Sequence, residues 1–194
     1  STVGGATTVT VENGGLTMTG GDGYYSNATI GHASSGSGAA YDGVVDVTVE
    51  DGDILLEAGS KEWFSFAQIG HGGWDSKNHS GNINVTADIG DITVLGGGAG
   101  IYNWAKIGHG GYGNSSSNRI RSGTIAVEST LGNVALDSRN GLFGYTQIGH
   151  GGLGKGSLMR GEYHDDVNVT AGKLVSVEAG GGENSFAMIG HGGT

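Results

Sequence analysis

The chain has 194 residues, which is enough for one ordinary domain with a continuous core. Glycine supplies 43 residues while proline and cysteine supply none, so the chain is rich in turns but is neither collagen-like nor cross-linked by disulfides. The net charge of −10 repels nucleic acid and anionic membranes, and no apolar run is long enough to span a bilayer, so we expect no nucleic-acid binding and no membrane insertion.

A short motif divides the chain into repeats. The tripeptide Ile-Gly-His recurs with successive histidines 39, 38, 41 and 41 residues apart, and four of the five copies continue with Gly-Gly. A nearly fixed period of this length is typical of repeat architectures. We therefore expect a single solenoid domain, residues 1–194, made of five units: 1–32, 33–71, 72–109, 110–150 and 151–194.

Along the chain, each unit contains three apolar segments in the same order. The first has small apolar residues in alternation, at 9–11, 47–49, 85–87, 127–129 and 169–171. The second has the same alternation, at 16–18, 54–56, 92–94, 134–136 and 175–177. The third ends in the Ile-Gly-His motif itself. Alternation and β-branched residues predict strands with one buried face, and the Asn, Asp and Gly residues between them supply corners.

These short strands cannot bury their apolar faces alone, but stacked units would pair equivalent strands and close a continuous core. The sequence therefore predicts an all-β fold, a parallel β-helix with one three-sided coil per unit. In this interpretation a loop of roughly 12 to 16 residues leaves the coil after each motif. Two coils per unit remain an alternative, because residues 119–123 are strand-like, although residues 115–118 are too polar for a strand.

Strand pairs with similar sequences recur along the chain, for example Asn-Val-Thr-Ala at 84–87 followed by Gly-Asp-Ile-Thr-Val at 90–94. They resemble the coils of filamentous-haemagglutinin-like exoproteins, the large bacterial adhesins exported by two-partner secretion. Similar pairs lie at 46–56, 124–136 and 168–177, so the resemblance covers most of the chain. The resemblance implies a right-handed parallel β-helix in a long secreted adhesin or fibre.

The motif histidines are expected to form a ladder along the solenoid: His32, His71, His109, His150 and His191. Alternation places each on the side of its preceding isoleucine, so we interpret them as neutral, inward imidazoles bonded to backbone carbonyls or to the next coil. A file of metal ions is the alternative, because imidazole binds zinc, copper and nickel. One column offers an ion two neighbours at most, and His79 and His164 stand apart, so we expect no metal and no cofactor.

A second column has the opposite parity from the isoleucines: Phe66, Trp104, Tyr145 and Phe186. As an outward-facing aromatic column it would stack on sugar rings or on a partner protein. The alternative is that the long loop folds back over it. Three loop residues at one offset from the histidines would then complete a satellite apolar cluster: Trp74, Tyr112 and Leu153.

No catalytic residue is expected. Acidic corners at 20–23 and 50–53 have calcium-type donors but lack the tandem Gly-Gly-x-Gly-x-Asp pattern of calcium-binding solenoids, so we interpret them as solvated turns. The basic residues are few and are expected mainly in loops: Arg119, Arg121, Lys155 and Arg160. Since every prominent feature is repeated whereas an active site normally occurs once, the chain is not expected to be an enzyme.

Together these features favour a structural or adhesive segment, a stalk or fibre, of a large extracellular protein at a bacterial surface. The expected partners are other copies of itself, stacked end to end, or a glycan or protein on a host or neighbouring cell. Neither end carries a polar capping segment, which favours a stretch of a longer array. Two alternatives stay open: a carbohydrate-binding module that uses the aromatic column, and a β-helical polysaccharide lyase or hydrolase.

Overall fold

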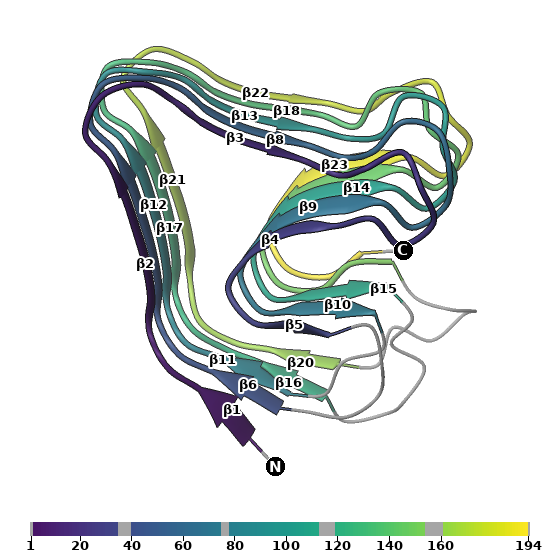
Figure 1. Cartoon of the computed structure of the whole chain (residues 1–194), viewed down its shortest axis with the longest axis horizontal. Coiled ribbons are helices and arrows are strands. Elements are labelled where there is room, and N and C mark those ends of the chain that lie inside the picture. The colour runs from purple at the N-terminus through teal and green to yellow at the C-terminus, as the bar shows by residue number, and fades with distance from the viewer. Residues whose placement is uncertain (1, 35–39, 75–77, 113–118, 154–160, 194) are drawn as a thin grey trace.

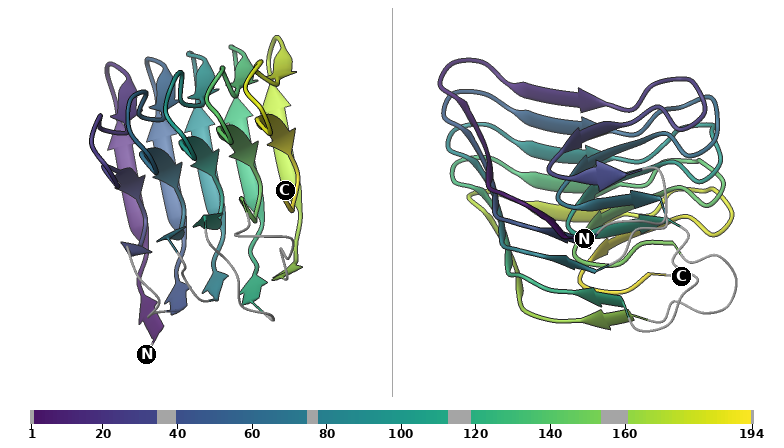
Figure 2. Two further views of the ribbon diagram at one scale, coloured as in Figure 1. Left: turned by 90° about the vertical axis from the view of Figure 1, so that its right-hand side faces the viewer. Right: turned by 60° about the horizontal axis from the view of Figure 1, so that its bottom comes forward.

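The structure is a computed structural model, and it describes residues 2–34, 40–74, 78–112, 119–153 and 161–193. The regular elements in these ranges are strands, and the strand pairs are parallel. Figure 1, which looks down the stack, shows the chain winding repeatedly over the same outline. The views in Figure 2 show the coils as successive layers. The predicted all-β parallel solenoid is confirmed.

Each coil offers five strand positions, and each position forms its own sheet. The first sheet contains β1 (Thr2–Gly4), β6 (Ala40–Asp42), β11 (His79–Ser80), β16 (Arg119–Arg121) and β20 (Gly161–Tyr163). The second contains β2 (Thr7–Val11), β7 (Val45–Val49), β12 (Ile83–Ala87), β17 (Ile125–Ser129) and β21 (Val167–Ala171). The third contains β3 (Leu16–Thr19), β8 (Ile54–Glu57), β13 (Ile92–Leu95), β18 (Val134–Asp137) and β22 (Val175–Glu178).

The remaining two sheets flank the Ile-Gly-His motif. The fourth contains β4 (Ala28–Ile30), β9 (Phe66–Ile69), β14 (Trp104–Ile107), β19 (Tyr145–Ile148) and β23 (Phe186–Ile189). The fifth contains β5 (Ala33–Ser34), β10 (Gly72–Trp74) and β15 (Gly110–Tyr112).

The register shows one coil per repeat. Val47 pairs with Val9 in the coil before it and with Val85 in the coil after it. Ile107 pairs in the same way with Ile69 and Ile148. The alternative of two coils per unit is therefore wrong.

The predicted three-sided coil is also wrong, because the first and fifth sheets add two further strand positions. They form from residues that we expected in the loop, including the segment with Arg119 and Arg121. Parts of the expected loops, among them residues 115–118, lie outside the described residues.

The fourth sheet is an internal layer that is buried on both faces. In Figure 1 it runs between the third and fifth sheets. One face carries residues such as Ala67 and Ile69, which join the main core with the apolar faces of the second and third sheets. The opposite face carries Phe66, which belongs to a separate cluster. This double coverage explains why β9, β14 and β19 are buried at every position, polar residues included.

Candidate functional site

The motif histidines stack into a ladder inside the solenoid. The ring centroids of His71 and His109 are 4.9 Å apart, those of His109 and His150 4.8 Å, and those of His150 and His191 4.9 Å, with interplanar angles of 10° or less. His32 lies 4.8 Å from His71 but is tilted by 52°. The spacing equals the distance between neighbouring strands, so one imidazole occupies each coil.

Both ring nitrogens of each inner histidine are used. Nδ1 of His109 accepts the backbone N–H of His71 at 3.0 Å, and its Nε2 lies 2.8 Å from the carbonyl oxygen of Gly81. His71 and His150 repeat this pattern, with their Nε2 atoms 2.9 Å from Gly43 O and 2.8 Å from Gly123 O. A nitrogen that accepts an N–H carries no proton, and a nitrogen that faces a carbonyl must carry one. The network therefore fixes the neutral Nε2–H tautomer.

The interior opposes protonation of the ladder. Burial lowers the pKa of His71, lowers the pKa of His109 well below its ordinary value, and lowers the pKa of His150 to about 3. Because neither ring nitrogen of these three residues is free, the ladder in this arrangement offers no lone pair to a metal ion. The described residues contain no group of three or more metal-ligating side chains.

The glycines of the motif allow the close stacking. Gly108 has a φ of +145°, and a Cβ built on it would overlap the carbonyl oxygen of Gly149 in the next coil. At the facing corner, the glycines that accept the Nε2–H bonds are equally crowded: a Cβ on Gly81 would overlap Gly43 O. Ile-Gly-His-Gly is thus one buried residue, one tight corner, one ladder residue and a second tight corner.

A third column ties these corners together and contains a buried lysine. It is formed by Gln68, Lys106 and Gln147, which pair in register. Gln68 Nε2 donates to the carbonyls of Gly108 at 2.9 Å and Gly110 at 3.0 Å. Gln147 Nε2 donates in the same way to the carbonyls of Gly190 at 3.0 Å and Gly192 at 3.1 Å.

Lys106, between the two glutamines, is 0% exposed. Its Nζ donates to His109 O at 2.8 Å and to Gly151 O at 2.6 Å. Burial lowers the pKa of Lys106 well below its ordinary value. A neutral amine has two N–H groups, which matches the two carbonyls that the side chain meets.

A fourth column faces the histidine ladder from the first sheet: Tyr41, His79, Arg121 and Tyr163. His79 was expected to stand apart, but it is 1% exposed and its ring lies 5.4 Å from that of Tyr41. Burial, and then the charge of Arg121, lowers the pKa of His79 to about 2. Arg121 was expected in a loop and is instead a fully buried residue of β16.

The outward-facing aromatic column is not exposed, which corrects that prediction. Phe66, Trp104 and Tyr145 are 3%, 0% and 0% exposed, and Phe186 is half-buried. They do face away from the main core, but Tyr112 and Leu153 pack against them in a second apolar cluster. The alternative of a satellite cluster therefore describes these residues. The side chain of Trp74 lies outside the described part of the chain.

Sequence reasoning missed a further aromatic ladder in the connections between the third and fourth sheets. Phe64 lies 5.1 Å from Tyr102 in a stacked pair, and Tyr102 lies 4.8 Å from Phe143. All three have a positive φ, between 52° and 61°, which costs a non-glycine residue about 1 kcal/mol or more. An aromatic-x-aromatic pattern in three successive units was the available signal: residues 64–66, 102–104 and 143–145.

The carboxylates of the acidic turns make polar contacts with neighbouring coils. Asp53 Oδ1 accepts the backbone N–H of Asp91 at 2.8 Å, and Asp91 accepts that of Asn133 at 2.7 Å. Asp22 pairs with Lys61 at 2.6 Å. These carboxylates thus satisfy turns and an exposed lysine.

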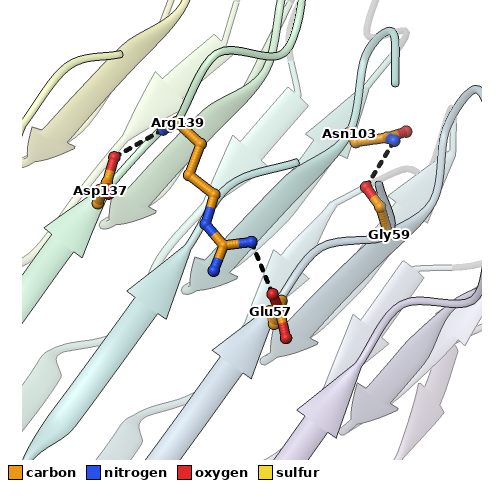
Figure 3. Close-up of polar contacts among 5 residues, drawn as sticks. All are labelled: Glu57, Gly59, Asn103, Asp137 and Arg139. Carbon is orange, nitrogen blue, oxygen red and sulfur yellow. Dashed lines mark hydrogen bonds and ion pairs between the residues drawn. The ribbon is translucent and has the colours of Figure 1, made fainter. Parts of the chain in front are cut away.

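Longer contacts cross the coils beside the third sheet, as Figure 3 shows. Arg139 Nη1 reaches Glu57 Oε1 at 2.6 Å, two coils away, while its backbone N–H donates to Asp137. The buried Asn103 donates from Nδ2 to Gly59 O at 2.7 Å. The first contact joins two coils that are not neighbours, and the second joins two neighbouring coils.

No protein-family model, curated protein sequence or solved structure matches the chain. In the ranges that the structure describes, no helix has the length and apolarity needed to cross a membrane.

Proposed function

We propose that the chain is a stiff structural segment, a stalk or fibre stretch, of a large bacterial protein exposed at the cell surface, where it serves attachment. The observation that carries this proposal is the register: equivalent residues of consecutive units lie on one another in all five sheets. Such a solenoid lengthens without changing its cross-section, which suits a spacer.

Stiffness is supported by the contacts between coils. The histidine ladder connects all five coils, the stacked aromatic residues connect four of them, and the glutamine and lysine column connects the glycine corners of the inner coils. The Arg139–Glu57 ion pair spans two steps at once. The sequences of the strand pairs, which resemble those of filamentous-haemagglutinin-like exoproteins, agree with this role. Secretion to the cell surface is part of the same proposal.

The test is to place tandem arrays of the chain between a surface anchor and a terminal tag, and to measure the height of the tag by electron microscopy. A rigid solenoid adds about 4.8 Å per coil, so height should rise linearly with the number of coils. Growth with the square root of the number of residues, as in a flexible chain, would contradict the stalk.

A fibre could also form if separate chains stacked end to end, and this self-assembly is a variant of the same proposal. Sedimentation of the isolated chain over a range of concentrations measures it. A species of constant mass would leave the spacer role intact and remove the self-assembled fibre.

Glycan binding is a second candidate, and exposed aromatic residues favour it at a different place from the predicted column. Tyr24, Tyr25 and Trp63 are 62%, 49% and 43% exposed, and the backbone N–H of Tyr25 bonds to Trp63 O. We expect Trp63→Ala to lower affinity on a glycan array at least tenfold. Leu131→Ala, at an exposed corner elsewhere, is the matched control. Equal binding by both variants would exclude this surface.

A further inference from the structure

Arg121 is a buried cation in a column that is otherwise uncharged. The side chain is 0% exposed, and the residues in register with it are His79 on one side and Tyr163 on the other. A Cβ built on Gly110 would lie 2.7 Å from Arg121 Nε, so the side chain runs closely along the bare backbone of β15. The guanidinium thus lies between the first and fifth sheets, away from solvent.

The guanidinium has no hydrogen-bond partner in the described part of the protein. Nε, Nη1 and Nη2 all lack an acceptor, although an arginine carries five N–H donors. The ring of Tyr163 lies 5.8 Å from its central carbon and offers a weak cation–π contact. Such a contact does not replace hydrogen bonds to a buried charge.

No negative charge of the described protein compensates Arg121. The charged and titratable groups that act on it or feel its field are Lys106, Arg119, His79, His150, Tyr145 and Tyr163, and none of these is a carboxylate. No aspartate or glutamate among the described residues is buried. Lysine can shed its proton, but a guanidinium keeps its charge in proteins. An unpaired buried ion is strongly destabilising, so a counter-ion from solution is the simplest complement.

We propose that the Arg121 guanidinium binds one small inorganic anion, of the size and charge of chloride, in the interior of the solenoid. The neighbouring side chains of Lys106 and Tyr145, like Arg121 itself, are 0% exposed, so the guanidinium is enclosed by protein and a small ion suits it better than a large one. The anion accepts the N–H groups that lack partners and cancels the charge between the two sheets.

Bromide supplies a direct test. Crystals of the whole chain grown in sodium bromide should show an anomalous peak within hydrogen-bonding distance of the Arg121 guanidinium. Ordered water at all three nitrogens and no bromide peak there would overturn the proposal.

The solution test compares chloride with the bulky anion gluconate at constant ionic strength. Above the dissociation constant, each tenfold rise in free chloride should lower the unfolding equilibrium constant tenfold. Arg121→Tyr copies the residue at Tyr41 and Tyr163 and should abolish this dependence. Arg139→Gln removes a partly exposed arginine and should preserve it.

An unchanged chloride dependence in Arg121→Tyr, or none in the parent protein, would contradict the site. Arg121→His, which copies His79, is the second variant if the tyrosine variant does not fold. The bromide experiment needs no variant, so it decides the question independently.

Discussion

At the scale of single residues, each position can be compared with the equivalent position in the neighbouring coils. Lys106 occupies a position where the coils on either side have Gln68 and Gln147, and all three side chains donate to corner carbonyls. The glutamine amide does so without a charge. Burial disfavours the charged lysine and lowers its pKa well below the ordinary value of 10.5, so near neutral pH the lysine costs folding free energy that a glutamine does not.

Lys106→Gln is therefore expected to stabilise the protein. Since the pKa of Lys106 is lower in the folded chain than in the unfolded chain, the unfolded chain binds more protons between the two pKa values, and the stability of the parent protein rises with pH toward 10 while that of the variant does not. The advantage of Lys106→Gln in urea unfolding should therefore shrink as the pH rises toward 10, by at most about 1.4 kcal/mol per pH unit. The exposed Lys61→Gln should leave stability almost unchanged at every pH in this range. A variant less stable than the parent at pH 7 would show that the lysine stays charged.

Gly81→Ala is expected to destabilise the fold by about 3 kcal/mol or more. The residue has a φ of +120°, and the new Cβ would overlap Gly43 O, so both backbone strain and overlap oppose it. Gly98→Ala is the control, because a Cβ there meets nothing within 4 Å. Chemical denaturation of both variants measures the difference, and similar losses would mean that the corner is less tightly packed than the structure indicates.

At the scale of elements, the strands with clean alternation were predictable and those without it were not. The second and third sheets carry mostly apolar residues, many of them β-branched, at every other position, so period and register follow from residues such as Val47 and Val85. The first sheet was missed because β11 and β16 contain His79, Arg119 and Arg121, and polar or charged residues normally indicate loops.

The burial of the aromatic column could not be read from alternation alone. Alternation shows that Phe66 and Trp104 face away from the main core, but not whether something covers that face. The cover consists of long-range packing by residues such as Tyr112 and Leu153. The histidine ladder, in contrast, depended on the fixed period, and the register of the coils stacks one imidazole on the next.

The ladder as an element predicts that acid destabilises the protein. The pKa of His150 is about 3 in the folded state and about 6.5 in the unfolded state, so the unfolded chain binds the extra proton as pH falls below 6.5. At pH 5 this one residue should cost about 2 kcal/mol of unfolding free energy, and His71 and His109 act in the same direction.

Unfolding free energies between pH 7 and 5 test this expectation, and nitrogen NMR should show the proton on Nε2 of His109 and His150 throughout. Equal stability at pH 7 and pH 5 would contradict the buried neutral ladder.

At the scale of the whole molecule, stability is a sum over coils and their contacts. Alternate residues of β7 are buried, whereas the equivalent residues of β21 are only partly buried, because in this structure one neighbouring coil covers them instead of two. Contacts between neighbouring coils dominate, with a few longer ties such as Arg139 to Glu57. A repeat protein of this kind should therefore tolerate removal of a whole coil far better than removal of part of one.

Deletion of residues 72–109 removes one whole period and joins His71 to Gly110. Since Gly110 pairs with Gly72 in the parent, the new junction repeats the old one, and His71 becomes the neighbour of His150 in the ladder. We expect this shortened chain to fold, with cooperative unfolding, lower total stability, and a maximum dimension along the stack that is shorter by about 4.8 Å in small-angle scattering. Deletion of residues 72–90 removes half a period and should prevent folding, because it places the apolar faces of the following strands out of register. If both deletions behaved alike, stacking in register would not be what stabilises this molecule.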